Sequence, residues 1–296
     1  MSNLQRIAVT GSSGLVGTAL VGALKAEGHT VQRLVRRKPV AVDEVLWDPT
    51  NGSVDLASLE GVDAIIHLAG AGVGDHRWTT KYRAEILNSR LLGTTAIAQA
   101  CSALKPSVFI SASAIGYYGE TGNRAVTEVD RGGDDFLAAV CREWEAAADL
   151  ATGVRTVKIR TGLVLDPTGG ALGRMLPLFR LGLGGKLGPG TQWWSWITLH
   201  DEVKAITHLL RADVEGAVNL TSPNPVTNQE FTGSLARALH RPALLPVPAF
   251  ALKAALGGFS TEILGSKKVM PAALLESGFT FDYPHLTSAL ELLCSE

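Results

Sequence analysis

The 296-residue sequence predicts an α/β protein, a doubly wound parallel sheet with a smaller, mainly helical C-terminal lobe. Three observations predict this class. Short apolar runs alternate with longer helical patterns through the first half of the chain, a glycine turn directly follows the first run, and the alternation stops where a glycine- and proline-rich stretch begins. Strands joined by helices in this way run parallel, because each crossover returns the chain to the same end of the sheet.

The expected strands are apolar runs bounded by turns. They cover residues 7–9, 30–35, 45–47, 64–68, 108–110 and 154–159. Helical patterns fill the spaces between them, at residues 16–27, 79–104 and 134–150, and Gly28 and Pro106 end the first two. The run at 64–68 is apolar enough for burial on both faces, which is typical of a central parallel strand.

The character of the sequence changes after about Thr161. Residues 1–165 are expected to form the sheet domain, and segment 196–222 is expected to return to it with a helix at 200–210 and a strand at 217–220. Residues 166–195 and 223–296 are expected to form the smaller lobe. Within the first of these segments, the glycine-rich run 182–190 is typical of a loop.

Composition excludes several classes of protein. A formal net charge of −1 gives no basic excess for nucleic acid or for an anionic membrane. The three cysteines, Cys101, Cys141 and Cys294, lie far apart without metal-ligand spacing, and their odd number fits a reducing compartment. No apolar run approaches ~18 residues, and the N-terminus has no signal-peptide pattern. We therefore expect a cytoplasmic protein without a metal site, a nucleic-acid partner or a membrane partner.

The glycine turn has the pattern G-x-x-G-x-x-G between a strand and an amphipathic helix. The first glycine permits the tight turn, the second lets backbone amides approach a pyrophosphate, and the third lets helix and strand pack closely. The helix N-terminus adds free N–H groups and the positive end of its dipole. This context predicts a Rossmann dinucleotide site at Gly11, Ser12, Ser13, Gly14, Leu15, Val16 and Gly17.

The end of the second expected strand indicates which nicotinamide cofactor binds. An NAD site usually places Asp or Glu there on the ribose 2′-hydroxyl, but no acidic residue lies between Glu27 and Asp43. Arg36 and Arg37 stand at this strand end instead, and a guanidinium can bind a 2′-phosphate through a charge-assisted fork. The pattern predicts NADP(H), with these two arginines as its 2′-phosphate ligands and Arg33 as a surface residue.

Several further blocks resemble the extended short-chain dehydrogenase/reductases, and more narrowly their atypical "epimerase family" branch (NAD-dependent epimerase/dehydratase-like) with its C-terminal domain of unknown function. The resemblance rests on His67-Leu68-Ala69-Gly70, Ser111-Ala112-Ser113, Tyr117-Tyr118-Gly119, Arg160-Thr161-Gly162, Trp47-Asp48-Pro49, Asn88-Ser89-Arg90, Trp144-Glu145, Trp196-Ile197 and Val269-Met270-Pro271. It implies cofactor contacts at Leu68, Ala69, Gly70, Glu85, Arg90, Ser111 and Val164.

The chain departs from that resemblance at the catalytic pair. Typical members carry Tyr-x-x-x-Lys on the helix after the fifth strand, where the lysine lowers the pKa of the tyrosine. None of the four tyrosines here has a lysine four residues later. By register, Leu137 stands at the tyrosine position and Cys141 at the lysine position, so the usual proton-transfer groups are missing.

Two hydroxyl groups remain as catalytic candidates, Ser113 and Tyr117, with Tyr118 as an alternative to Tyr117. We expect Glu145 to pair with an arginine or to cap nearby backbone, and Cys141 to be a small core residue. The run Thr227-Asn228-Gln229-Glu230 is typical of an N-terminal helix cap before Phe231. The tryptophans in 193–196 fit either a pocket wall or packing between the lobes.

Two functions follow from these expectations. The first is an NADP(H)-dependent oxidoreductase or epimerase acting on a small or sugar-like substrate. The second is an NADP(H)-binding redox sensor or regulatory protein without turnover, which a pocket filled by Trp193 or Trp194 would favour.

Overall fold

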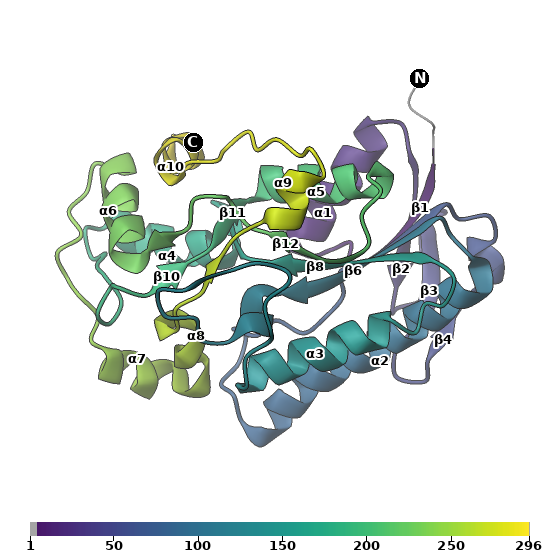
Figure 1. The fold of residues 1–296 in the computed structure, drawn as a ribbon, viewed down its shortest axis with the longest axis horizontal. Helices are drawn as coiled ribbons and strands as arrows, with labels where there is room; N and C mark the ends of the chain where they lie inside the picture. The colour runs from purple at the N-terminus through teal and green to yellow at the C-terminus, as the bar shows by residue number, and fades with distance from the viewer. Residues whose placement is uncertain (1–4, 296) are drawn as a thin grey trace.

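The computed structural model of the chain describes residues 5–295 and confirms the doubly wound parallel sheet (Figure 1). The first residues, where no signal peptide is expected, lie outside this range. All neighbouring strands of the main sheet are parallel except the last pair. In spatial order the strands are β12 (Gly216–Leu220), β8 (Arg155–Thr161), β6 (Val108–Ala114), β5 (Ala64–His67), β1 (Arg6–Thr10), β2 (Thr30–Val35), β3 (Glu44–Asp48) and β4 (Ser53–Val54).

Helices cover both faces of the sheet, because side chains alternate between the faces along each strand. Ile7 and Val9 point into a core with α1 (Leu15–Ala26), α5 (Leu199–Arg211) and α9 (Ala272–Glu276). Ala8, between them, points into a second core with α2 (Thr80–Leu104) and the end of α3 (Phe136–Ala148). Figure 1 shows α2 and α3 side by side along one face and α1 and α5 along the other.

The lobe packs α4 (Gly170–Arg180), α6 (Asn228–Ala238) and α10 (Leu286–Cys294) around Trp196 and Phe231. Helix α4 lies inside the glycine- and proline-rich stretch, where no helix is predicted. The remaining elements are β7 (Ala125–Val126), β9 (Leu163–Asp166), β10 (Trp193–Trp194), β11 (Trp196–Thr198), β13 (Val226–Thr227), β14 (Lys268–Val269), α7 (Ala249–Leu256), α8 (Ser260–Leu264), η1 (Ala57–Leu59), η2 (Ile115–Tyr118) and η3 (Gly257–Phe259). None of the helices described is both long and apolar enough to traverse a bilayer.

Side-chain caps fix where the helices around the site begin. Thr79, Asp135 and Thr198 each accept a hydrogen bond from a backbone amide in the first turn of α2, α3 and α5. Thr227 and Glu230 form a reciprocal capping box at the start of α6, which confirms the cap predicted there. These bonds satisfy N–H groups that have no partner within the helix, so each helix starts at a defined residue.

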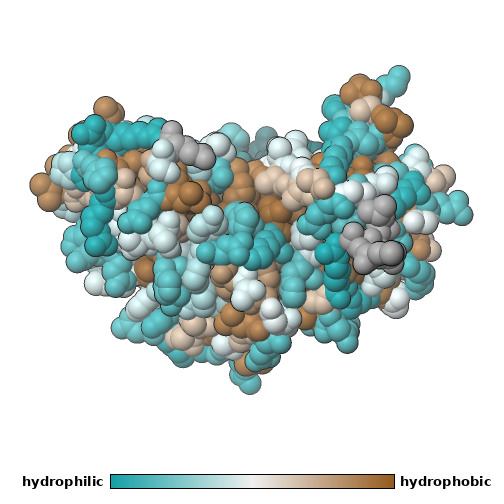
Figure 2. All heavy atoms as spheres, turned by 90° about the horizontal axis from the view of Figure 1, so that it is seen from above, coloured by the Kyte–Doolittle hydropathy of each residue, from teal (hydrophilic) through white to brown (hydrophobic). Residues whose placement is uncertain are grey.

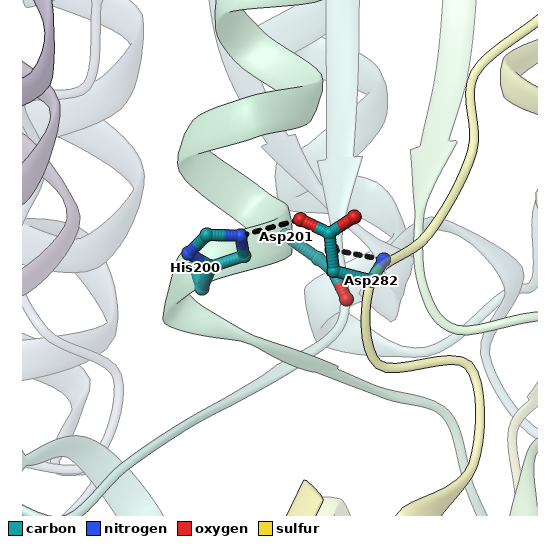
Figure 3. A group of neighbouring side chains, drawn as sticks. All are labelled: His200, Asp201 and Asp282. Carbon is teal, nitrogen blue, oxygen red and sulfur yellow. Dashed lines mark hydrogen bonds and ion pairs between the residues drawn. The ribbon is translucent and has the colours of Figure 1, made fainter.

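The first turn of α5 anchors the end of the chain to the sheet domain (Figure 3). Asp201 is fully buried, and its two carboxylate oxygens accept the backbone amides of Asp282 and Tyr283, each at 2.9 Å. On the exposed side, Asp282 bonds His200 Nε2 at 2.7 Å and Lys204 Nζ at 2.5 Å. The carboxylates of Asp201 and Asp282 are therefore already hydrogen-bonded to protein donors. We call the two Asp201 bonds the latch, because they hold the C-terminal segment to α5.

The next residue, Glu202, is a buried acid that forms no ion pair within residues 5–295. Its Oε1 accepts the Thr161 hydroxyl at 2.7 Å, while Oε2 has no hydrogen-bond partner among the described residues. Burial raises the pKa of Glu202 to about 8, so the folded protein keeps this carboxyl protonated at neutral pH.

Replacing Asp201 by Ala should lower the free energy of unfolding by about 3 kcal/mol, because two part-buried backbone amides lose their acceptor. The measurement is urea denaturation followed by circular dichroism. His200→Ala is the matched control and should cost less than about 1 kcal/mol, since its ion pair with Asp282 is half exposed. Equal losses in the two variants would contradict the latch.

Glu202→Gln should flatten the pH dependence of stability. The unfolded chain releases this proton near the ordinary pKa of 4.5, whereas the folded chain holds it to about pH 8. The wild type therefore loses stability as the pH rises through this window, by up to about 1.4 kcal/mol per pH unit. Urea denaturation of both proteins at pH 5, 6, 7 and 8 measures the difference, and parallel curves would show that Glu202 titrates normally.

Candidate functional site

A cavity of about 1130 Å³ lies at the carboxyl ends of β1, β2 and β5. Ligands of doubly wound sheets bind at this edge, where the strand order reverses. Seen from above, the molecule is hollowed between its lobe and the end that carries β2 and β3 (Figure 2). The lining includes the predicted residues Gly11, Ser12, Ser13, Gly14, Arg36, Arg37, Leu68, Ala69, Gly70 and Glu85.

The glycine turn forms one wall of this cavity. Gly11 has a φ of +67°, and a Cβ there would lie 2.8 Å from the carbonyl carbon of Leu68. A Cβ at Gly17 would overlap the Gly11 carbonyl oxygen, so this glycine allows helix and turn to pack. Helix α1 has no side-chain cap at Gly14 and no acidic residue in its first turn. Its terminal amides are therefore available to an anion.

A buried hydroxyl fixes the floor of the cavity. Thr10 Oγ1 accepts the amides of Leu68 and Ala69 at 3.1 and 3.3 Å and lies 2.8 Å from His67 Nδ1. Burial lowers the pKa of His67 to about 3, so its ring is neutral. Because Thr10 Oγ1 already accepts two amides, its proton is best placed on Nδ1. No sequence pattern marked Thr10, which holds the 68–69 backbone against Gly11.

The predicted 2′-phosphate ligands differ from each other in their surroundings. Arg36 and Arg37 both follow the end of β2 and are both exposed. Arg37 donates to the two carboxylate oxygens of Glu44, at 2.8 and 2.5 Å. Arg33 is half-buried, pairs with Asp43 and lines the cavity, and its expected role as a surface residue without a cofactor contact stays a prediction. Register explains the pairing, because β3 begins beside β2 and brings its acidic residues to the arginines of β2.

The other residues predicted to contact the cofactor, from the glycine turn or from the resemblance, lie outside the cavity lining. Ser111 and Gly17 are buried, Val16 and Val164 pack against the α1–α5 core, and Leu15 contacts the 169–170 turn. Arg90 lies behind Gly70 and donates to the carbonyl oxygen of Ala71 at 2.9 Å. Its guanidinium stacks on Trp144 at 4.7 Å, and burial lowers its pKa. Cofactor contact by these residues stays a prediction.

A buried hydrogen-bond network lies at the carboxyl end of β6. Arg160 donates from Nε and Nη2 to the two carboxylate oxygens of Glu145, each at 2.8 Å, which confirms the expected arginine partner. The Ser113 hydroxyl donates to the same carboxylate at 2.7 Å. Arg160 also donates to the Tyr118 hydroxyl at 2.9 Å, and that hydroxyl donates to Asn219 Oδ1 at 2.8 Å. Every one of these side chains is buried.

This network separates the catalytic candidates. Tyr118 is a structural residue, because its hydroxyl is engaged on both sides and burial raises its pKa to about 12. Ser113 directs its proton at Glu145. Tyr117 is only half-buried, and the Arg160 guanidinium lies 3.4 Å from the centre of its ring. Roles for Ser113 and Tyr117 in a reaction stay predictions.

Helix α3 carries Leu137 and Cys141 at the positions where the resemblance places the usual proton-transfer groups. Leu137, Cys141 and Glu145 are four residues apart, so they share one face of the helix, and all three are buried. The Cys141 thiol donates weakly to the carbonyl oxygen of Ala114 at 3.7 Å, and burial raises its pKa to about 12. Cys141 is therefore a core residue, as expected, and an unreactive one.

The tryptophan run does not line the cavity. Trp194 packs on Phe231 in the lobe core, and Trp196 is fully buried beside it. Trp193 donates from Nε1 to Asn123 at 3.0 Å, with the Lys268 ammonium 3.9 Å from its ring centre. Each of these side chains is engaged by packing or by a hydrogen bond within the protein, so the structure favours packing over a pocket wall.

Comparison with known proteins agrees with this architecture. The model of the NAD dependent epimerase/dehydratase family matches residues 7–221, and that of a domain of unknown function (DUF1731) matches residues 247–293. An epimerase family protein of Mycobacterium bovis is 43% identical over 288 residues, with 96% of each chain covered. Human epimerase family protein SDR39U1 is 36% identical over 294 residues, covering 97% of this chain and 98% of the human one.

Solved structures give the same result. A crystal structure of human SDR39U1 with NADPH superposes with a TM-score of 0.92 at 35% identity, covering 98% of this chain and 99% of that one. A nucleoside-diphosphate sugar epimerase from Corynebacterium glutamicum superposes at 0.82 and 35% identity, covering 99% of this chain and 59% of that one. The chain therefore belongs to the NAD dependent epimerase/dehydratase family, within the group of epimerase family proteins that carry the DUF1731 domain.

Proposed function

We propose that this protein binds NADP(H) in the cavity at the carboxyl edge of its sheet and transfers hydride between it and a small or sugar-like substrate. One observation carries the proposal. The cavity joins an uncapped helix N-terminus to an exposed arginine, Arg36, that no carboxylate engages in the described chain. Those are the two features that a pyrophosphate and a 2′-phosphate need. The similarity to human SDR39U1, crystallised with NADPH, supports the same ligand.

The residues present fit this cofactor along most of its length. The amides that follow Gly14 would hold the pyrophosphate, and Arg36 would hold the 2′-phosphate. Arg90 adds a cation without a carboxylate partner among the described residues, directly behind Gly70. When bound, the cofactor supplies the hydride, and the chain supplies position and electrostatics.

Proton transfer is the step for which this chain offers least. With Leu137 and Cys141 in place of the usual pair, Tyr117 is the strongest remaining donor to a substrate oxygen. Ser113 could assist only after giving up its bond to Glu145. A substrate that needs orientation more than acid catalysis suits this site best.

The same helix face supports a second candidate, an NADP(H)-binding sensor or regulatory protein without turnover. Leu137 and Cys141 stand at the positions of the usual catalytic tyrosine and lysine. Both side chains are buried, and neither exchanges a proton at neutral pH. Binding itself would need the glycine turn and Arg36 but not a proton donor. We further propose a reducing, cytosolic setting, since all three cysteines are free.

Calorimetric titration of ligand-free protein should show NADPH binding about tenfold or more tightly than NADH, because a charge-assisted bond contributes about 1.5–3 kcal/mol. Arg36→Ala should bring the two dissociation constants close together, with an unchanged melting temperature as the control. Equal affinities in the wild type would remove the 2′-phosphate assignment. Binding of neither dinucleotide would overturn the proposed function.

Tyr117→Phe should reduce turnover of any carbonyl substrate found by screening about 100-fold or more, because the variant lacks the hydroxyl donor. NADPH oxidation at 340 nm gives kcat, and calorimetry should show unchanged NADPH affinity. Unchanged kcat would exclude Tyr117 from the mechanism. Tight NADPH binding without turnover on any substrate would favour the sensor.

A further inference from the structure

Four alternating charges lie where β2 meets β3. Arg33 and Arg37 come from the β2 side, and Asp43 and Glu44 from the start of β3. Arg33 Nη2 lies 2.8 Å from Asp43 and 3.2 Å from Glu44, and Arg37 Nη2 lies 2.5 Å from Glu44. Both arginine charges are thus compensated. Arg36, between them in sequence, takes no part in any of these pairs.

Glu44 is held in place from several sides. Its side chain is only 2% exposed, and its Oε2 accepts the amide of Val40 at 2.9 Å in addition to Arg37. The Arg37 guanidinium, foremost, together with this amide, lowers the pKa of Glu44 to about 2. The carboxylate is therefore ionised at every working pH, and the 38–43 loop cannot carry it away without breaking backbone hydrogen bonds.

Glu44 therefore competes with a cofactor phosphate for Arg37. A fork bond between guanidinium and carboxylate uses the same N–H groups that would bind a phosphate. A 2′-phosphate at the end of β2 could take over these N–H groups of Arg37 only by displacing Glu44. The buried Glu44 carboxylate would then lose its two bonds to Arg37 and keep the longer contact with Arg33 and the Val40 amide. Arg36 can bind the phosphate without breaking an ion pair, since it is exposed and lines the cavity.

We infer that Glu44 withholds Arg37 from the 2′-phosphate, so that Arg36 alone reads this group and Glu44 limits how strongly the protein prefers NADP(H) to NAD(H). The inference rests on the proposed function. It makes Glu44 a positioning residue that acts through Arg37. In this assignment Arg36 binds the phosphate, and Arg37 holds the 38–43 loop in place through its bond to Glu44.

The test is the ratio of the NADH to the NADPH dissociation constant, measured by calorimetry at two salt concentrations. Glu44→Gln should raise this ratio roughly fivefold or more and steepen its salt dependence, because Arg37 becomes free to pair with the phosphate. Arg37→Ala should leave the ratio unchanged, while Arg36→Ala should lower it to about one. The double variant Glu44→Gln/Arg37→Ala should lose the gain of the single one.

Asp43→Asn is the matched control, because it removes one negative charge from the same group but pairs with Arg33 and Lys25 instead of Arg37. Its ratio should stay near that of the wild type. An equal rise in Asp43→Asn and Glu44→Gln, a fall in Glu44→Gln, or an Arg37→Ala ratio as low as that of Arg36→Ala would each overturn the inference. Melting temperatures, together with binding of 2′,5′-ADP against 5′-AMP, separate a selectivity change from misfolding.

The two proposals fail in distinguishable ways. If the wild type shows no preference for NADPH, the proposed function fails before Glu44 is considered. If the wild type prefers NADPH, this preference depends on Arg36, and Glu44→Gln leaves the ratio unchanged, only the assignment of Glu44 fails.

Discussion

The buried ion pair between Glu145 and Arg160 is the interaction around which the rest of this structure is arranged. It joins α3 to β8, and through Ser113 and Tyr118 it reaches β6, η2 and Asn219 of β12. Asn219 in turn donates to the carbonyl oxygen of Met270 at 2.9 Å, which brings in the C-terminal segment. Burying two charges is costly unless further hydrogen bonds satisfy them, and here Ser113 and Tyr118 provide those bonds. The carboxyl edge of the sheet is thereby fixed as one polar unit.

This network also explains the chemistry that the site lacks. The helix face that usually presents a tyrosine and a lysine here presents Leu137, Cys141 and Glu145. The only ionised group on this face is already neutralised by Arg160. The carboxyl edge of the sheet can therefore orient a dinucleotide, but it offers few groups that could donate a proton to a substrate. This combination suits a binding protein as well as an enzyme with modest demands on acid catalysis.

The other end of the cavity follows a different rule. There the charges are at the surface, and the neighbouring strand decides which of them stay available. Strand β3 supplies two carboxylates to the arginines of β2, so that a basic strand end has a single uncompensated arginine, Arg36, facing the cavity. Selectivity at such a site depends on pairing between strands as much as on the residues of the strand itself.

The sequence by itself determined the order of the main strands and helices of the sheet, the dinucleotide turn and the absence of the Tyr-x-x-x-Lys pair. These features are local, because the period of apolar residues, the glycine spacing and a four-residue helical step are all written within short windows. It also predicted that Glu145 would find an arginine and that Thr227 would cap a helix. The helix α4 escaped prediction because its window is rich in glycine and proline, and packing in the lobe overrides that local preference.

Only the tertiary structure decided which polar groups are free. Thr10, Glu44, Arg160 and Asp201 have partners 7 to 82 positions away, and no local pattern marks them. A sequence window records which residues carry charge or a proton. Whether a group is available to a ligand depends on what the fold places beside it, and for Ser113, Tyr118 and Arg37 the fold has already supplied a partner.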